Sequence, residues 1–319
     1  MEAAFETLLG ADRDPAVAGA FLMGLAQRGE SATEIAAAAR ILRNYAKAVQ
    51  APQGAVDCCG TGGDARGTYN ISTAVALVCA ACGVPVAKHG NRAASSKSGA
   101  ADVLEALGVS LNASQKTHEQ ALQDLNFTFL MAPHHYDILR PLAPIRAALG
   151  FRTLFNILGP LANPAGTKRQ LIGVFKPDLC PLMANALKEL GSERAWIVHG
   201  RDGLDEITLT TSTDVTALEP DGTIKDFTLT PDDFGLPSCN ADDLKGGSAE
   251  ENATALERLL QGAKSAYRDV VLANSAAVLK ISDQVKTLKE GVQNATTAID
   301  AGKAHDTLTH YIDLTNQNK

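Results

Sequence analysis

A basic, hydroxyl-rich segment carries more potential chemistry than any other part of this sequence. Residues 88–99 read Lys-His-Gly-Asn-Arg-Ala-Ala-Ser-Ser-Lys-Ser-Gly, with three cationic side chains, three serines, an amide and two glycines. Such a set supplies donors to phosphate oxygens and lets a ligand approach the main chain closely. The segment follows an expected strand and precedes an expected helix, where open α/β sheets bind ligands. We therefore expect an anion site here; the alternative is a solvated basic loop.

Two further segments could bind phosphate. Gly60-Thr61-Gly62-Gly63-Asp64 follows an apolar strand, and its adjacent N–H groups could form a concave anion site. A purely structural turn is an equal alternative. Residues 68–73, Thr-Tyr-Asn-Ile-Ser-Thr, lead into an apolar helix, and a helix N-terminus favours negative charge. Asn70 and Ser72 are also good helix caps, so capping alone could explain them.

Carboxylates and arginines indicate two other kinds of site. Asp205-Glu206 follow an expected strand, and magnesium prefers carboxylate oxygens shared with substrate phosphates. Arg146 and Arg152 lie in an expected helical segment, and a guanidinium can bind an organic carboxylate with two parallel hydrogen bonds. Taken singly, a surface acidic turn and surface salt bridges explain these groups equally well or better.

These segments must be positioned by strands and helices that alternate from residue 55 onwards. The pattern predicts a largely parallel sheet covered on both faces. The later part of the α/β pattern is expected to contain a helix ending at Gly191 and a β-hairpin within 207–228 around Asp221-Gly222. A helical C-terminal stretch follows the capping box at Ser248. The expected strands are 55–59, 84–87, 127–132, 171–175 and 195–199, and the expected helices are 72–82, 99–107 and 114–125.

Residues 1–54 are expected to form a small helical domain, and residues 55–319 an α/β domain. Residues 16–27 have helical spacing, and Ala51-Pro52-Gln53-Gly54 breaks the pattern. A second helical segment is expected at 138–158, and residues 136–158 are expected to pack onto the first domain. Ser31-Ala32-Thr33-Glu34 is a capping box for a helix with one apolar face, made of Ile35, Ala38, Ala39, Leu42, Tyr45 and Ala46.

Composition places the chain among soluble globular proteins of the cytoplasm. It has 319 residues, 45% hydrophobic and 20% charged, and its net charge of −7 argues against nucleic-acid binding. No apolar run approaches the roughly 20 residues that span a bilayer, and Met1–Leu9 lacks the basic start of a signal peptide. Cys79 and Cys82 have no second pair to complete a zinc site, so reduced, structural cysteines are expected.

Together these segments resemble the anthranilate phosphoribosyltransferase family, from about Ala20 to the C-terminus. The resemblance implies a small helical domain beside an α/β domain with a mainly parallel central sheet, as in nucleoside phosphorylases, and a homodimer. It implies transfer of the phosphoribosyl group of phosphoribosyl pyrophosphate to the amine of anthranilate, the second step of tryptophan biosynthesis, with two Mg²⁺ ions per site. The segments that carry it are 60–64, 70–73, 88–99, 102–108, 156–164 and 203–206.

The resemblance also implies roles for individual residues. Lys88, Asn91 and Arg146 would be catalytic, and Ser72, Asp205 and Glu206 would bind magnesium. Anthranilate would contact Gly60, Asn91 and Arg146. Phosphoribosyl pyrophosphate would be bound by Gly60, Gly63, Asp64, Thr68, Asn70, Ile71, Ser72, Thr73, Lys88, His89, Gly90, Asn91, Arg92, Ala93, Ala94, Ser95, Ser96 and Ala100.

The chain departs from the family pattern in two places. It begins after most of the family's first helix, and His135-Tyr136-Asp137 stand where the family more often has His-His-Pro, next to the anthranilate entrance. Two alternative functions stay open at this point. One is a pyrimidine nucleoside phosphorylase-like enzyme, and the other is a nucleic-acid-binding relative, which the negative charge and Asp205-Glu206 oppose.

Overall fold

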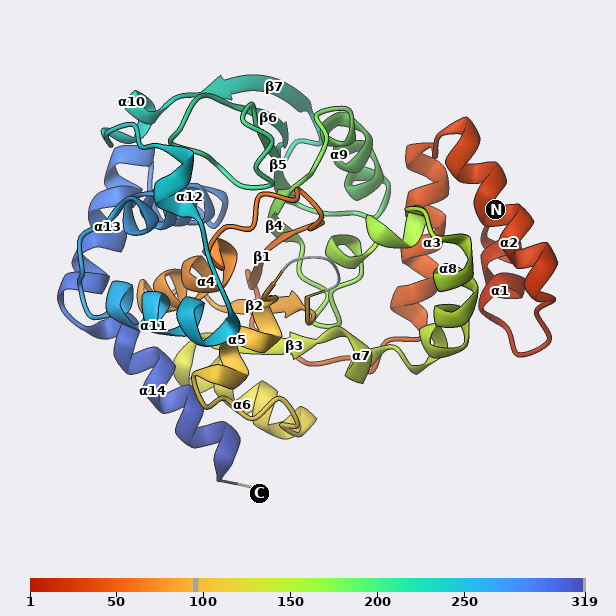
Figure 1. The fold of residues 1–319 in the computed structure, drawn as a ribbon, viewed down its shortest axis with the longest axis horizontal. Helices are drawn as coiled ribbons and strands as arrows, with labels where there is room; N and C mark the ends of the chain where they lie inside the picture. The colour runs from red at the N-terminus through yellow and green to blue at the C-terminus, as the bar shows by residue number, and fades with distance from the viewer. Residues whose placement is uncertain (94–96, 318–319) are drawn as a thin grey trace.

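The chain folds into a helical lobe and a larger α/β lobe, as Figure 1 shows for the computed structural model, which describes residues 1–93 and 97–317. The helical lobe contains α1 (Glu2–Leu9), α2 (Pro15–Arg28) and α3 (Ala32–Asn44). The predicted capping box starts α3, because Ser31 and Glu34 each accept a hydrogen bond from the other's backbone N–H. Tyr45, predicted to lie on the apolar face of α3, is instead 50% exposed, since α3 ends at Asn44.

A seven-stranded sheet crosses the α/β lobe in the order β3-β2-β1-β4-β5-β6-β7. The first five strands pair in parallel, and β6 and β7 form the antiparallel hairpin predicted around Asp221-Gly222. The predicted fold class is therefore confirmed. The strands are β1 (Val56–Gly60), β2 (Val86–Gly90), β3 (Phe127–Met131), β4 (Arg169–Gly173), β5 (Arg194–Gly200), β6 (Thr213–Leu218) and β7 (Ile224–Leu229).

Helices cover the sheet on both faces, and most of the core is aliphatic and alanine-rich. On one face α4 (Ile71–Ala81) packs against β1 and β2 and is itself covered by α12 (Ala266–Ile281). On the other face α9 (Leu179–Glu189) lies between β5 and α3, so it joins the two lobes (Figure 1). The remaining helices of the α/β lobe are α5 (Ala100–Ala106), α6 (Gln115–Leu125), α10 (Pro231–Phe234), α11 (Ala249–Leu260), α13 (Leu288–Asp300) and α14 (Lys303–Asn316).

Residues 138–158, predicted as one helical segment, form several short pieces. After α7 (Ala132–His135) come a 3-10 helix at Asp137–Leu142 and α8 (Ala143–Leu149). Gly150 ends α8 because it adopts φ +67°, a left-handed conformation that glycine takes without strain. Two 3-10 turns follow, at Leu154–Asn156 and Gly159–Leu161. In space α8 packs against α2, beside the helical lobe (Figure 1).

Strand β2 is shifted from its predicted position at 84–87. It begins after Pro85, which has no N–H group to donate, and continues through Lys88, His89 and Gly90, which pair with β3. The start of the basic segment is thus strand rather than loop. Successive strand residues point to opposite faces, so Lys88 and His89 lie on different sides of the sheet. The other predicted strands and helices of the α/β lobe lie within two residues of their predicted limits, except that the hairpin predicted within 207–228 begins only at Thr213.

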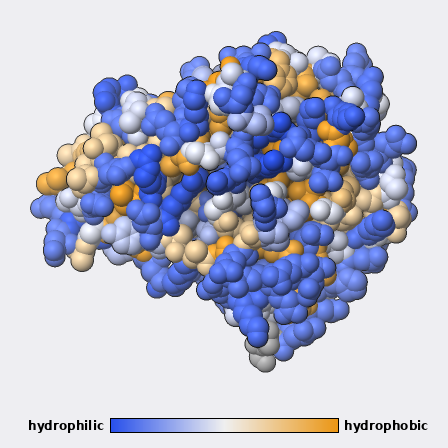
Figure 2. Space-filling view, turned by 180° about the vertical axis from the view of Figure 1, so that it is seen from behind, coloured by the Kyte–Doolittle hydropathy of each residue, from blue (hydrophilic) through white to orange (hydrophobic). Residues whose placement is uncertain are grey.

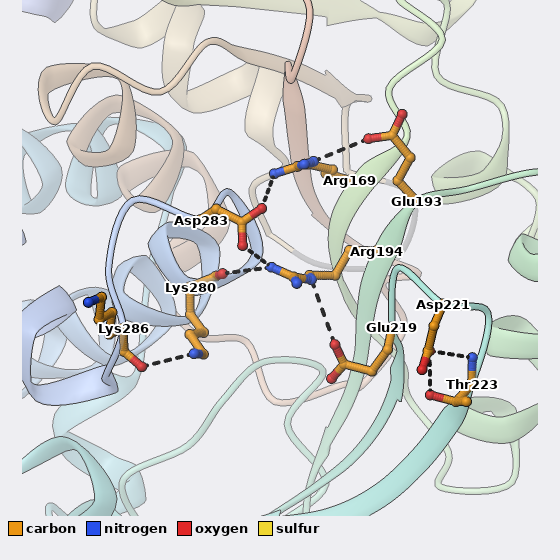
Figure 3. A network of polar contacts seen from close by, with 9 residues as sticks. All are labelled: Arg169, Glu193, Arg194, Glu219, Asp221, Thr223, Lys280, Asp283 and Lys286. Carbon is orange, nitrogen blue, oxygen red and sulfur yellow. Dashed lines mark hydrogen bonds and ion pairs between the residues drawn. The ribbon is translucent and has the colours of Figure 1, made fainter.

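Ion pairs fasten the amino ends of β4 and β5 to the turn that follows α12 (Figure 3). Arg169 and Arg194 both bind the carboxylate of Asp283, Arg169 at 2.8 Å. Arg169 also contacts Glu193 at 3.3 Å. Because the acids are about half exposed, each single pair stabilises the fold only modestly. Their common effect is to fix α12 against the strands whose other ends carry the site described next.

Among the helices that the structure describes, none combines the length and the apolar composition needed to cross a bilayer.

Candidate active site

A cavity of about 410 Å³ opens at the carboxyl ends of β1, β2, β4 and β5. Each segment singled out for binding phosphate, metal or carboxylate contributes to its wall. Of the predicted site residues that the structure describes, Thr73 is absent from this wall, because its side chain is 1% exposed within α4. Ala94, Ser95 and Ser96 lie outside the described residues. The predicted residues that line the cavity are Gly60, Gly63, Asp64, Thr68, Asn70, Ile71, Ser72, Lys88, His89, Gly90, Asn91, Arg92, Ala93, Ala100, Arg146, Asp205 and Glu206.

The N-terminus of α4 faces this cavity, and its cap residue makes no side-chain hydrogen bond to the helix. Asn70 occupies the cap position, but its side chain bonds elsewhere: Nδ2 donates to Ser98 O at 3.4 Å, and Oδ1 accepts from Asn252 Nδ2 at 2.9 Å. Side-chain capping by Asn70, the alternative explanation for this residue, is therefore not observed. The first N–H groups of a helix have no partner within it, and the helix dipole adds partial positive charge. This end of α4 is suited to a phosphate.

Acidic side chains are buried in the wall of the cavity, and one of them contacts the first turn of α4. Asp205 accepts a hydrogen bond of 2.9 Å from Gly62 N–H, and Glu206 accepts from the N–H and hydroxyl groups of Ser72. Burial, followed by repulsion from Asp64, raises the pKa of Asp205 well above its usual range. Burial also raises the pKa of Glu206 to about 7, although Lys88 opposes that rise.

The charges of these carboxylates suit a divalent cation. Asp64 Oδ2 is buried and, among the described residues, has no hydrogen-bond donor. A Mg²⁺ ion would remove the repulsion and satisfy such oxygens. Within the described residues, no three Asp, Glu, His or Cys side chains are grouped so that they could enclose a metal ion. Magnesium usually takes only one or two protein carboxylates and shares the rest of its shell with water and phosphates, so the residues present fit it.

Lys88 is the buried cation of the site, at 1% exposure. Its Nζ donates to Cys58 O at 2.8 Å and to Ser72 Oγ at 3.0 Å. This position places a positive charge beside the first turn of α4 and near Glu206. Its neighbour His89 turns to the other face, where Nδ1 contacts Gly159 O at 3.1 Å. Burial lowers the pKa of His89 to about 4, so its imidazole is neutral at pH 7.

Arg92, predicted as a phosphate-binding cation, is paired with acids on α5. Its Nη1 contacts Asp102 at 2.9 Å and Glu105 at 2.7 Å. Its side chain is therefore already neutralised in this conformation. Asn91 is exposed at the cavity wall, and its Oδ1 accepts from Arg92 N–H at 2.8 Å.

Two arginines enter the cavity from the segment beside the helical lobe. The guanidinium carbon of Arg146 lies 5.5 Å from the ring centre of Phe155, and no carboxylate forms an ion pair with it among the described residues. Burial lowers the pKa of Arg146, which favours a carboxylate ligand as its partner. Arg152 lies 4.1 Å from the ring centre of Phe175 and donates to Gly63 O at 2.5 Å.

Sequence reasoning missed several residues of the site. Phe155 and Phe175 line the cavity. The sequence could have indicated them, because Phe155 lies near the end of an expected helical segment and Phe175 stands at the end of an expected strand. Gly173 lies directly against the backbone of Asp205, where a Cβ atom would overlap the Asp205 carbonyl. Asp57, buried in β1, accepts from Asn163 Nδ2 at 2.8 Å and His89 N–H at 3.2 Å, and so joins β1 and β2 to the 156–164 segment.

Comparison with known proteins agrees with this geometry. Residues 52–305 match the α/β domain of the glycosyl transferase family, and residues 1–46 match its helical bundle domain. An anthranilate phosphoribosyltransferase of Rhodospirillum rubrum is 52% identical over 309 residues, which are 97% of this chain and 89% of that protein. The chain belongs to the anthranilate phosphoribosyltransferase family. The family and enzyme class predicted from the sequence, a phosphoribosyl-transferring glycosyltransferase, are confirmed.

Solved structures of anthranilate phosphoribosyltransferases have the same fold. The enzyme from Thermus thermophilus superposes with a TM-score of 0.92 at 41% identity, over 98% of this chain and 94% of that one. The enzyme from Saccharomyces cerevisiae, in complex with PRPP and Mg, superposes with a TM-score of 0.88 at 30% identity, over 98% of this chain and 91% of that one.

Proposed function

We propose that this chain joins anthranilate to phosphoribosyl pyrophosphate in the 410 Å³ cavity, releasing pyrophosphate, as the second step of tryptophan biosynthesis. The observation that carries the proposal is the meeting of three kinds of group in one cavity. These are the N-terminus of α4, the buried carboxylates Asp205 and Glu206, and the guanidinium of Arg146. Respectively, they suit a phosphate, a divalent cation and an organic carboxylate.

The donor would lie across the ends of β1 and β2. Main-chain N–H groups of the glycine loop, residues 60–64, and the start of α4 would bind phosphate oxygens. Lys88 would add the buried charge, held in place by Ser72 and Cys58. Because the guanidinium of Arg92 is paired with Asp102 and Glu105, we assign its phosphate contact to the main chain rather than to the side chain.

Ser72, Asp205 and Glu206 would hold magnesium, with two ions in each site. The raised pKa values of the two acids and their burial support this assignment, since each carboxylate lacks a fixed cation that would fully neutralise it. The yeast relative was solved with PRPP and Mg. Bound magnesium would neutralise charge that develops on the departing pyrophosphate.

The acceptor would lie on the side of the helical lobe, with its carboxylate on Arg146. That contact would aim the aromatic amine at the anomeric carbon, and Asn91 and Gly60 would complete the pocket. An aromatic amine is neutral at pH 7 and weakly nucleophilic, so pyrophosphate departure would run ahead of attack. The residues of the site would then stabilise charge rather than form a covalent intermediate.

The departure at Tyr136-Asp137 affects the connection between the lobes rather than the cavity wall. Neither residue lines the cavity. The buried hydroxyl of Tyr136 donates to Ala162 O, and Asp137 contacts Lys47 at 2.6 Å and Arg140 at 3.0 Å. We therefore propose that the altered residues leave the lining of the anthranilate pocket unchanged.

A homodimer through the helical lobe is part of the proposal. Val17 and Met23 on α2 are 67% and 46% exposed, and Figure 2 shows apolar surface over the end of this lobe, at the left of that view. Exposed apolar patches mark contact surfaces, and two-fold dimers pair one patch with its copy. Sedimentation should give a dimer for the wild type and a monomer for Val17→Glu. A monomeric wild type would contradict this part.

Other assignments of the proposal follow the sequence. We divide the chain into a helical domain, residues 1–54 with 136–158 against it, and an α/β domain, residues 55–319. The contacts of α8 with α2 support that division. We place the protein in the cytoplasm, and its six free cysteines support a reducing compartment.

Fluorescence tests the function directly. Anthranilate fluorescence should fall when phosphoribosyl pyrophosphate and magnesium are both present, and should stay constant when either is left out. Constant fluorescence in the complete mixture would refute the proposal. Phosphorolysis of pyrimidine nucleosides and salt-dependent DNA binding, measured on the same sample, would reveal the two alternative functions instead.

A further inference from the structure

Arg152 connects two parts of the active-site cavity that come from distant parts of the chain. It follows α8, six residues after Arg146, on the segment beside the helical lobe. Its Nη2 donates to Gly63 O at 2.5 Å, and its guanidinium carbon lies 4.1 Å from the ring centre of Phe175, two residues after β4. One side chain therefore spans from the acceptor side of the cavity to the donor side.

The glycine loop is shaped to receive this contact. Gly62 and Gly63 have φ values of +65° and +80°, which other residues rarely adopt. A Cβ atom at Gly63 would overlap the guanidinium of Arg152, so only glycine permits the approach. On the other side, Gly62 N–H donates to Asp205 Oδ2 at 2.9 Å. Consecutive loop residues are thus fixed between Asp205 and Arg152.

The chemistry of this contact is particular to arginine. Among the described residues no carboxylate forms an ion pair with Arg152, whereas most surface arginines of this chain, such as Arg140, contact one. A planar guanidinium can stack on an aromatic ring and donate from its edge at the same time. A lysine ammonium carries the same charge, but it cannot make both contacts with that geometry.

We propose that Arg152 is a positioning residue, which holds the glycine loop at a fixed distance from the segment that carries Arg146. The proposal rests on the proposed function, in which the loop binds the donor and Arg146 binds the acceptor. Reaction requires the amine and the anomeric carbon to approach within about 3–3.5 Å in the right orientation. Without its contact with Arg152, the glycine loop would hold the donor so that the anomeric carbon is misplaced relative to the amine of the acceptor.

Steady-state kinetics of four variants tests this role. In Arg152→Met the guanidinium is lost, in Arg152→Lys the charge is kept, and in Phe175→Leu the stacking surface is lost; the fourth variant combines Arg152→Met with Phe175→Leu. We expect kcat to fall about tenfold in each single variant, with smaller rises in both KM values. The double variant should have the same kcat as Arg152→Met, because both changes break the same contact. Its kcat would then be about tenfold higher than the product of the two single losses predicts, a coupling of about 1.4 kcal/mol.

Arg140→Met is the matched control, because Arg140 lies on the same segment with a side chain 78% exposed and a single partner, Asp137. It should retain wild-type kinetics. Full activity of Arg152→Lys would assign Arg152 the role of a simple charge and overturn the proposal. The proposal would also be overturned if the losses in kcat of the two single variants multiplied in the double variant. It would equally be overturned if Arg152→Met had a lower melting temperature but unchanged kinetics. Inactive wild-type protein would instead refute the proposed function itself, and this proposal with it.

Discussion

Gly62 N–H donates a hydrogen bond of 2.9 Å to Oδ2 of Asp205, a residue 143 positions further along the chain. This bond joins the glycine loop after β1 to the acidic turn after β5. The proposed donor-binding loop and the proposed metal ligands are therefore directly connected. Changes at either residue are expected to affect both substrate phosphate and metal.

Neutral replacement of the acids should abolish turnover. In Asp205→Asn combined with Glu206→Gln, the shapes are kept but the negative charges that would hold magnesium are lost. We expect kcat to fall by at least about a hundredfold, and calorimetry with MgCl₂ and phosphoribosyl pyrophosphate to lose its heat of binding. Normal kcat would refute the metal assignment.

The same variant should not unfold more easily than the wild type. Burial and then repulsion from Asp64 raise the pKa of Asp205, and burial raises that of Glu206 to about 7, so the charged forms destabilise the metal-free fold at pH 8. Urea unfolding at that pH should give a free energy at least equal to that of the wild type. Asp242→Asn is the control, because the Asp242 side chain is 81% exposed and does not line the cavity.

Arg146→Ala should mainly raise the KM for anthranilate. A charged hydrogen-bonded pair contributes about 1.5–3 kcal/mol, which corresponds to a rise of about 10- to 100-fold. The KM for phosphoribosyl pyrophosphate should change little, because Arg146 lies on the acceptor side. Arg140→Ala, on the neighbouring 3-10 helix, should leave both constants unchanged. A larger effect on the donor KM than on the anthranilate KM would show that Arg146 has been assigned to the wrong substrate.

Gly60→Ala should impair the donor site through sterics alone. A Cβ atom at Gly60 would lie 2.5 Å from Asp205 Oδ2, so either the loop or the carboxylate must move. A misplacement of about 1 Å can reduce rates about a hundredfold, and we expect that loss in kcat/KM for phosphoribosyl pyrophosphate. Gly159→Ala is the matched control, since no atom lies within 4 Å of its added Cβ. Equal activities of the two variants would contradict the close packing at Gly60.

Much of the fold could be predicted because local signals agreed with tertiary packing. The capping boxes at Ser31 and Ser248 start α3 and α11 as expected, and the short apolar runs became central strands. The glycine loop, the α4 start, the basic segment and Asp205-Glu206 do line one cavity. They meet because parallel strands present the loops that follow them at one edge of the sheet.

Other features depended on contacts that spacing does not encode. Asn70 fits the cap position, yet tertiary contacts with Ser98 and Asn252 take its side chain away from the helix. The segment 138–158 has helical composition, but Gly150 in a left-handed conformation ends α8 and turns Arg152 towards the glycine loop. The two partners of Arg92 on α5, Asp102 and Glu105, are likewise visible only in three dimensions.

Two buried histidines should make the fold sensitive to mild acid. Burial lowers the pKa of His89 and of His118 to about 4, whereas an unfolded histidine titrates near 6.5. A depressed folded-state pKa stabilises the protein above the unfolded pKa, and that stability is lost as the pH falls from about 6.5 towards 4. We expect each histidine to reduce the free energy of unfolding by about 2 kcal/mol between pH 7 and pH 5.

Urea unfolding of His118→Gln tests this expectation, because His118 is buried between α6 and β3. From pH 7 to pH 5 the free energy of unfolding of this variant should fall by about 2 kcal/mol less than that of the wild type. His310→Gln, at an exposed position, should follow the wild type, and an unchanged pH dependence in His118→Gln would disprove the assignment.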